Sequence, residues 1–203
     1  MAKGTGIVVA AVVIALVLAN HEDDDGGAAT GSASGGGNAS AAQFAASRQA
    51  MLRGEPTVAW SRLGMARTAK DASRRDTDCA SHSYGQVRRY LRRVPCRVMD
   101  RVLFTVDDKG GNTIAIAVAW VRFDTPAAAR EFKRIDDTWG TGQVRPLPGS
   151  TLGLPDIRLS GQHYASRREG SLTVVAEAEE VADGELDDAF LDEIAGVAVL
   201  LPH

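Results

Sequence analysis

The side chains best suited to chemistry in this 203-residue chain are a run of arginines. Six of them lie within fourteen positions and are opposed only by Asp100: Arg88, Arg89, Arg92, Arg93, Arg97 and Arg101. Guanidinium groups bind phosphates and carboxylates through paired N–H donors, so the run predicts an anion-binding patch. A solvated helix face, paired with the acidic C-terminal helix, is the alternative that the sequence leaves open.

Two cysteines, Cys79 and Cys96, flank the segment that carries most of these arginines. A helix of about twelve residues is roughly 17 Å long, and its flanks can fold back until the two Cα atoms reach disulfide distance. We therefore predict a disulfide across this helix, with two separate buried thiols as the alternative. No CxxC motif or further Cys/His cluster indicates redox or zinc chemistry.

No catalytic constellation is recognisable in the sequence. The four histidines are scattered singly, and the chain contains no Walker A, HExxH or GxSxG motif. We therefore expect no enzyme, no cofactor and no metal site. The formal net charge of −3, from 23 Lys and Arg against 26 Asp and Glu, gives no reason to expect a nucleic-acid partner.

A polar pocket is the feature that would favour an enzyme or an accessory subunit instead. Its candidate residues are His163 and Tyr164, together with the loop Gly140–Gly142. A cavity deep enough to enclose a ligand, with polar groups converging there, would support this alternative. Asp136 and Asp137 adjoin the same loop and are interpreted as solvated helix surface.

The arginines need an amphipathic helix to place them on one face. Ser83 and Gln86 fit a capping box that starts such a helix, and Pro95 ends it. Apolar residues recur at i, i+3, i+4 and i+7 on the opposite face, at Val87, Tyr90, Leu91 and Val94. The pattern predicts a helix whose buried and basic faces are clearly separated.

The remaining elements follow from periodicity and turn residues. Alternating apolar residues over 102–106 and 114–120 predict a β-hairpin, and 157–167 with 172–177 predict a second pair of strands. Thr125 and Pro126 start a helix whose inner face we assign to Ala128, Phe132, Ile135 and Trp139, and a last helix starts near Leu186. The expected fold is α+β, in the order α-β-β-α-β-β-α, with helices packed on an antiparallel sheet of about four strands.

The N-terminus carries the clearest signal for localisation. Gly4–Asn20 has no charged residue, and its 17 residues would reach about 25 Å as a helix. This predicts a transmembrane anchor or a cleaved signal peptide, because small residues precede a possible cleavage site after Ala19. Lys3 precedes the segment and no Lys or Arg follows until Arg48, so the N-terminus is expected inside and the rest of the chain outside.

Four regions are expected along the chain. Residues 1–20 form the membrane anchor or signal segment, and 21–40 form a flexible linker rich in Gly, Ser and Ala. Residues 41–76 read as a weakly helical arm, and 77–203 as the extracytoplasmic α+β domain.

Several of these motifs together resemble a family of exported or membrane-anchored actinobacterial domains of unknown function. The motifs span the chain from Cys79 toward the C-terminus and are Cys79–Ser83, Pro95–Cys96, Val118–Val121, Asp137–Gly142 and Tyr164–Gly170. The resemblance implies an extracytoplasmic location. It implies no catalytic residue.

The sequence thus favours a membrane-tethered or secreted cell-envelope domain with a non-catalytic binding or structural role. Its expected partners are the membrane, through the N-terminal helix, and anionic lipid or cell-wall polymer, through the arginine run. A protein partner cannot be named from the sequence.

Overall fold

The computed structural model of the chain describes residues 39–154, 157–182 and 186–203. Five α-helices, a short 3-10 helix and five strands lie in these ranges. In chain order they are α1 (Ala41–Leu52), α2 (Pro56–Arg62), β1 (Met65–Asp76), α3 (Gly85–Arg93), β2 (Val98–Asp108), β3 (Thr113–Arg122), α4 (Pro126–Asp136), η1 (Gly149–Leu152), β4 (Tyr164–Glu169), β5 (Leu172–Glu180) and α5 (Asp188–Ala198).

The five strands form one antiparallel sheet in the order β1-β2-β3-β5-β4. The predicted hairpin over 102–120 is confirmed as β2 and β3, with Val102 opposite Val118. The second predicted pair is present in part, because its first strand, β4, begins at Tyr164 and not at Ile157. β5 lies between β3 and β4, and the sheet has five strands where about four were expected. Every residue from Ile114 to Val121 in β3 is buried, as expected for a central strand covered on both faces.

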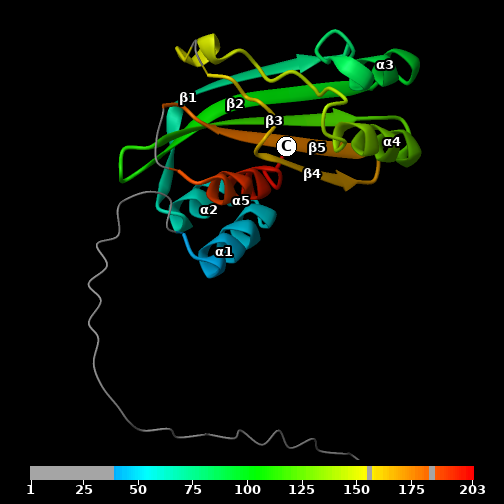
Figure 1. Cartoon of the computed structure of the whole chain (residues 1–203). Helices are drawn as coiled ribbons and strands as arrows, with labels where there is room; N and C mark the ends of the chain where they lie inside the picture. The colour runs from blue at the N-terminus through cyan, green and yellow to red at the C-terminus, as the bar shows by residue number, and fades with distance from the viewer. Residues whose placement is uncertain (1–38, 155–156, 183–185) are drawn as a thin grey trace, which may run out of the picture. The chain divides into compact units, whose positions relative to one another are not determined.

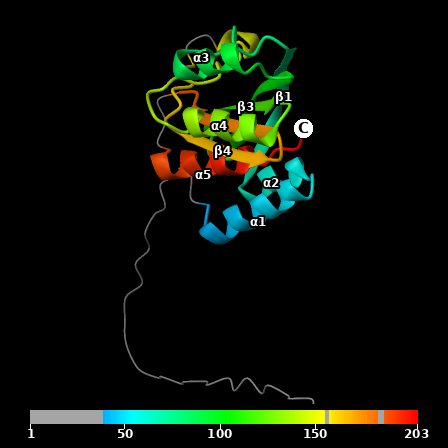
Figure 2. The same ribbon diagram turned by 90° about the vertical axis from the view of Figure 1, so that its right-hand side faces the viewer.

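Helices cover both faces of the sheet (Figures 1 and 2). One face of β3, which carries Ile116 and Trp120, packs in one core with residues of α1, α2 and α5. The other face, which carries Ala119 and Val121, packs in a second core with α3 and α4. The side chains of α3 and α5 therefore lie on opposite sides of the sheet.

The expected boundary at Asp76 is not found, because the supposed arm belongs to the domain. β1 pairs with β2 along most of its length, and Phe44, Met51 and Trp60 of α1 and α2 are buried in the core under the sheet. The order is therefore α-α-β-α-β-β-α-β-β-α. β1 was missed because an edge strand rich in charge shows no apolar alternation, which also protects it from pairing with other chains.

The start of α3 also differs from the prediction. The helix begins at Gly85, and Ser83 donates its hydroxyl to the Cys79 carbonyl instead of capping the helix. The Gln86 N–H, which has no acceptor within the first turn of the helix, donates to the carbonyl of Thr141. A loop distant in the sequence therefore caps the helix in place of the Ser83 side chain. The predicted Thr125 cap of α4 is confirmed, since its side chain accepts from the Ala128 N–H.

The predicted disulfide between Cys79 and Cys96 is present and joins the two flanks of α3. Among the helices of residues 39–154, 157–182 and 186–203, none is long and apolar enough to cross a membrane. The predicted membrane segment Gly4–Asn20 and nearly all of the predicted linker lie outside the described residues.

Candidate functional site

The predicted arginine patch is only partly assembled. Arg97 pairs with Asp124 at 3.1 Å on the surface. Arg101 is buried in β2, where it pairs with Asp76 and donates to the Arg145 carbonyl, both at 2.9 Å. Arg101 is therefore not accessible to a ligand, and Arg97 has an acidic partner of its own.

The other four arginines share α3, and we call Arg88, Arg89, Arg92 and Arg93 the arginine face. Arg89, Arg92 and Arg93 are exposed, and Arg88 is half-buried. None of the four makes an ion pair within the described part of the chain. The alternative that pairs them with the acidic C-terminal helix is wrong, because α5 lies across the sheet.

A pocket of about 220 Å³ lies between the end of α4, the loop that follows it and the start of α3. Its lining combines acidic, aromatic and small polar residues, and we call it the Asp136 pocket. The lining residues are Tyr84, Asp136, Asp137, Thr138, Trp139, Gly140, Gly142, Gln143, Ser160, Gly161 and Tyr164.

The wall of the Asp136 pocket forms where two distant segments touch. The Tyr84 N–H donates to the Gln143 carbonyl at 3.0 Å, and the Tyr84 hydroxyl donates to the Gln143 side chain at 3.1 Å. This approach needs Gly142, which has φ +99°, because a Cβ there would lie 2.4 Å from the Tyr84 carbonyl oxygen. The glycine thus has a geometric role that the sequence motif alone did not reveal.

Asp136 is the most unusual group in this pocket. Only 4% of it is exposed, and its Oδ1 has no hydrogen-bond partner of good geometry. Burial raises the pKa of Asp136 to about 7, and the charge of Asp137 adds to the rise. Hydrogen bonds from the Tyr164 hydroxyl and the Val144 N–H, together with the charge of Lys133, oppose it. The interpretation of Asp136 as solvated helix surface is wrong.

Tyr164 connects the two neighbouring acids. Its hydroxyl lies 2.7 Å from Oδ2 of Asp136 and 3.1 Å from Oδ1 of Asp137. The hydroxyl donates to Asp136. A phenol has one proton to donate, so the two carboxyl groups compete for a single donor. Ser166 donates to the same Asp137 oxygen at 2.5 Å, and Lys133 pairs with the other oxygen at 2.5 Å.

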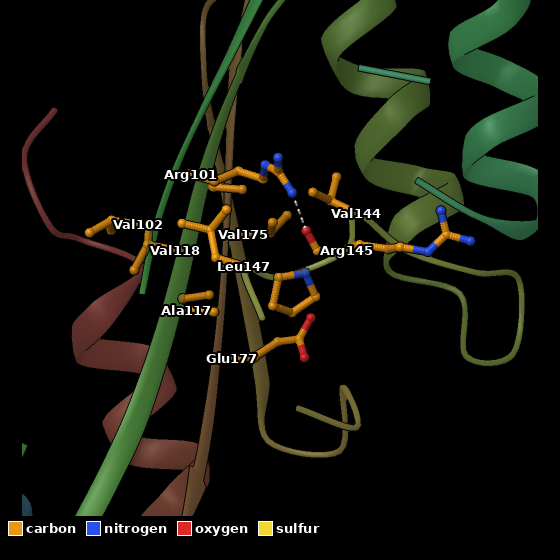
Figure 3. Close-up of a pocket in the computed structure, with 12 residues that line it drawn as sticks. Arg101, Val102, Ala117, Val118, Val144, Arg145, Leu147, Val175 and Glu177 are labelled. Atoms are coloured by element: carbon orange, nitrogen blue, oxygen red, sulfur yellow. Dashed lines mark hydrogen bonds between the residues drawn. The ribbon is translucent and has the colours of Figure 1, made fainter. Parts of the chain in front are cut away.

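Glu177 is a second buried acid on the same face of the sheet, in β5 opposite Tyr164. Burial, together with the charge of Asp136, raises its pKa to about 7. It lines a separate cavity of about 10 Å³ that Arg101 also lines, and Figure 3 shows these two side chains at opposite ends of that cavity. A space of about 10 Å³ holds one water at most, so it is no ligand site.

Of the residues proposed for a pocket from the sequence, Tyr164, Gly140 and Gly142 line the Asp136 pocket and His163 does not. The His163 ring is buried toward α5, with Nδ1 3.0 Å from Asp192 and Nε2 3.6 Å from Asp188. Neighbouring residues of an extended segment point to opposite sides, so only one of the pair could face the pocket.

Trp139 was also misplaced by the sequence pattern. It was assigned to the buried face of the helix, but α4 ends at Asp136 and Trp139 is 77% exposed at the pocket. The helical period does not apply beyond the last turn, so the i+4 spacing from Ile135 carried no information there. A tryptophan beside Gly140 and two acids was the available sign of a binding loop.

The Asp136 pocket brings together several kinds of polar group. Its lining offers a buried carboxyl, hydroxyls and an exposed indole. The hydroxyl of its serine, Ser160, donates to Glu179 at 3.1 Å. Among the described residues, no group of three or more acids, histidines or cysteines is arranged to hold a metal ion. Comparisons with protein-family models, with curated proteins and with solved structures found no match to the chain, so its function is argued from the site alone.

Proposed function

We propose that the chain is a membrane-tethered or secreted domain of the cell envelope with a non-catalytic binding role. The charge-free segment Gly4–Asn20 supports the export of the domain. The disulfide between Cys79 and Cys96 supports it too, because such bonds persist in oxidising compartments outside the cytoplasm.

The arginine face is the surface that makes contact, and its partner is an anionic surface. The observation that carries this proposal is the exposure of Arg89, Arg92 and Arg93 on one short helix, with no acidic partner in the described residues. The chain as a whole has a net charge of −3, so the positive charge is concentrated on this helix and is not a property of the whole molecule. Each arginine near an anionic membrane contributes about 1 kcal/mol of attraction.

Vesicle binding tests this proposal directly. The exported chain should bind vesicles that contain phosphatidylglycerol, bind neutral phosphatidylcholine vesicles weakly, and lose binding as salt is raised. Anionic wall polymer in place of vesicles distinguishes the two sources of negative charge. The triple variant Arg89→Ala, Arg92→Ala and Arg93→Ala should lose this binding.

A matched control removes the same charge elsewhere. Arg62, Arg74 and Arg168 are exposed but do not belong to α3, so their triple replacement by Ala should leave most of the binding intact. Equal losses in the two triple variants would reduce the effect to net charge. Unchanged binding in the α3 variant would end the proposal.

The Asp136 pocket favours the second candidate function, that of an enzyme or accessory subunit with a polar pocket. A cavity is present where Tyr164 meets the Gly140–Gly142 loop, although His163 is turned away from it. We infer that it binds a ligand, because its lining gathers hydrogen-bonding groups and charge around one cavity. Turnover of any bound compound by the purified chain would favour the enzyme instead.

A further inference from the structure

The charge of the Asp136 pocket selects against anions. Asp136 and Asp137 line it, and no lysine or arginine of the described residues does. The nearest positive groups are already engaged: Lys133 pairs with Asp137, and the Arg145 guanidinium lies over the Tyr84 ring, 5.6 Å from its centroid. An anionic ligand would meet two carboxyl groups, while the nearby Lys133 is already paired with Asp137.

The carboxyl group of Asp136 could accept a further hydrogen bond at Oδ1. Oδ1 is buried and accepts no bond of good geometry, and Oδ2 accepts from the Tyr164 hydroxyl. The Val144 N–H also interacts with this carboxyl. A buried acceptor without a donor is unfavourable, and a charged N–H group would satisfy both its hydrogen bond and its negative charge. The ligand that fits the carboxyl group of Asp136 is a cation that carries N–H groups.

An aromatic surface is free to meet the same cation. The Trp139 side chain lines the pocket and is 77% exposed, and the faces of indole rings attract cations. The ring of Tyr84 already has Arg145 over it, and the Tyr164 hydroxyl lies against the two acids. Trp139 is the most exposed aromatic side chain of the lining.

The volume of the pocket limits the size of the cationic ligand. Its volume of about 220 Å³ is below the range of roughly 300–1,000 Å³ that is typical of pockets for larger organic ligands. We propose that the Asp136 pocket binds a primary ammonium group on a short alkyl stem, at a site separate from the arginine face. Asp136 receives the ammonium group and Trp139 covers it.

Calorimetric titration of the full chain at pH 8 with four small probes tests the ligand class. n-Butylammonium should bind at least about tenfold more tightly than butan-1-ol, which has a similar shape and one donor but no charge. Butyrate should not bind. Tetramethylammonium should bind more weakly than n-butylammonium, because it brings charge without an N–H donor.

A fifth probe identifies the source of the ammonium group. Nα-acetyl-lysine methylamide presents the same butylammonium end on a peptide unit. Binding about tenfold tighter than that of n-butylammonium would assign the site to lysine-like side chains of peptides. Equal binding would assign it to small free amines, and both results support the proposal.

Two variants locate the site. Asp136→Asn keeps the shape of the side chain and removes its charge, so it should weaken n-butylammonium binding at least about tenfold. Trp139→Ala alters an exposed side chain and should weaken binding about two- to fivefold. Asp124→Asn is the matched control, because Asp124 is an exposed aspartate paired with Arg97.

Proton release gives an independent readout. The ionised form of Asp136 is the one that pairs with an ammonium group, so binding at pH 6 should release up to about one proton and binding at pH 8 almost none. Titrations in two buffers of different ionisation enthalpy measure this number. Asp137, Glu177 and Tyr164, which face Asp136, are the same in wild type and in Trp139→Ala, so that variant should release the same number of protons.

Three results would overturn the proposal. The first is equal affinity for n-butylammonium and butan-1-ol, and the second is no detectable binding of any cationic probe. The third is undiminished binding by Asp136→Asn that circular dichroism shows to be folded. If Asp136→Asn does not fold, undiminished binding by Trp139→Ala decides against the proposal instead. Because the arginine face is intact in every variant, vesicle binding reports separately on the proposed function.

Discussion

Replacing Asp136 with Asn should flatten the dependence of stability on pH between pH 5 and 8. Asp136 is 4% exposed, and burial raises its pKa to about 7 from the ordinary value of 3.8. An acid whose pKa is higher in the folded than in the unfolded state favours folding at low pH. That contribution is complete below the unfolded pKa and is lost as the pH rises through the folded pKa.

The magnitude follows from these two pKa values. Between pH 5 and pH 8 a single group of this kind lowers the free energy of unfolding by about 2.5 kcal/mol. Glu177, whose pKa is also raised to about 7, acts in the same direction. The two contributions are not simply additive, because the charge of Asp136 is one of the causes of the rise at Glu177.

Urea unfolding at pH 5, 6, 7 and 8, followed by the fluorescence of the buried Trp60, measures this difference. The stability of the wild type should fall by at least about 2.5 kcal/mol more than that of Asp136→Asn over this range. Taking the difference between the two proteins removes the pH dependence that comes from the titratable groups present in both. Asp124→Asn, at an exposed ion pair, should keep the wild-type slope. Equal slopes in wild type and Asp136→Asn would refute the buried-acid reasoning.

Two further predictions test the parts that build the pocket wall and the helix behind it. Gly142→Ala should destabilise the domain by about 2–4 kcal/mol in urea unfolding, because its Cβ would meet the Tyr84 carbonyl. Gly140→Ala has similar positive φ but open space, so it should cost only about 1–2 kcal/mol, and equal costs would contradict the close approach. Reducing the Cys79–Cys96 bond should lower stability by about 3 kcal/mol, and thiol labelling of the exported protein should find no free cysteine. Two labelled thiols would show that the bond does not form.

Patterns that repeat within one element were readable in the sequence. The alternation over 102–106 and 114–120 predicted the β2-β3 hairpin, and Thr125 with Pro126 predicted the start of α4. The apolar stripe of α3, which includes Val87 and Leu91, predicted which of its faces is buried. In each case the local period and the burial in the fold agree.

Features set by contacts between distant segments were not readable. β1 is stabilised by pairing with β2 and has too little apolar alternation to be recognised alone. Asp136 reads as surface in a helix that ends in acids, and only the approach of β4 and the 141–144 segment buries it. The exposure of Trp139 depends on where α4 ends, and helix ends are among the least certain features of a sequence pattern.

The six arginines show the same division. Their sequence run predicted a single patch, yet the fold buries Arg101 in β2 and pairs Arg97 with Asp124. The four that remain share one helix, for which the period of the sequence was informative. The proposed contact surface is therefore smaller than the run of arginines that first indicated it.

Arginine-directed dicarbonyl labelling, read by mass spectrometry with and without anionic vesicles, tests the central claim most directly. In the free chain the exposed Arg89, Arg92 and Arg93 should react, as should the exposed controls Arg62 and Arg168. Bound to vesicles, the three residues of α3 should be protected while the two controls still react. Uniform labelling of all five residues, or protection confined to Arg62 and Arg168, would contradict the proposal that the chain contacts anionic surfaces through α3.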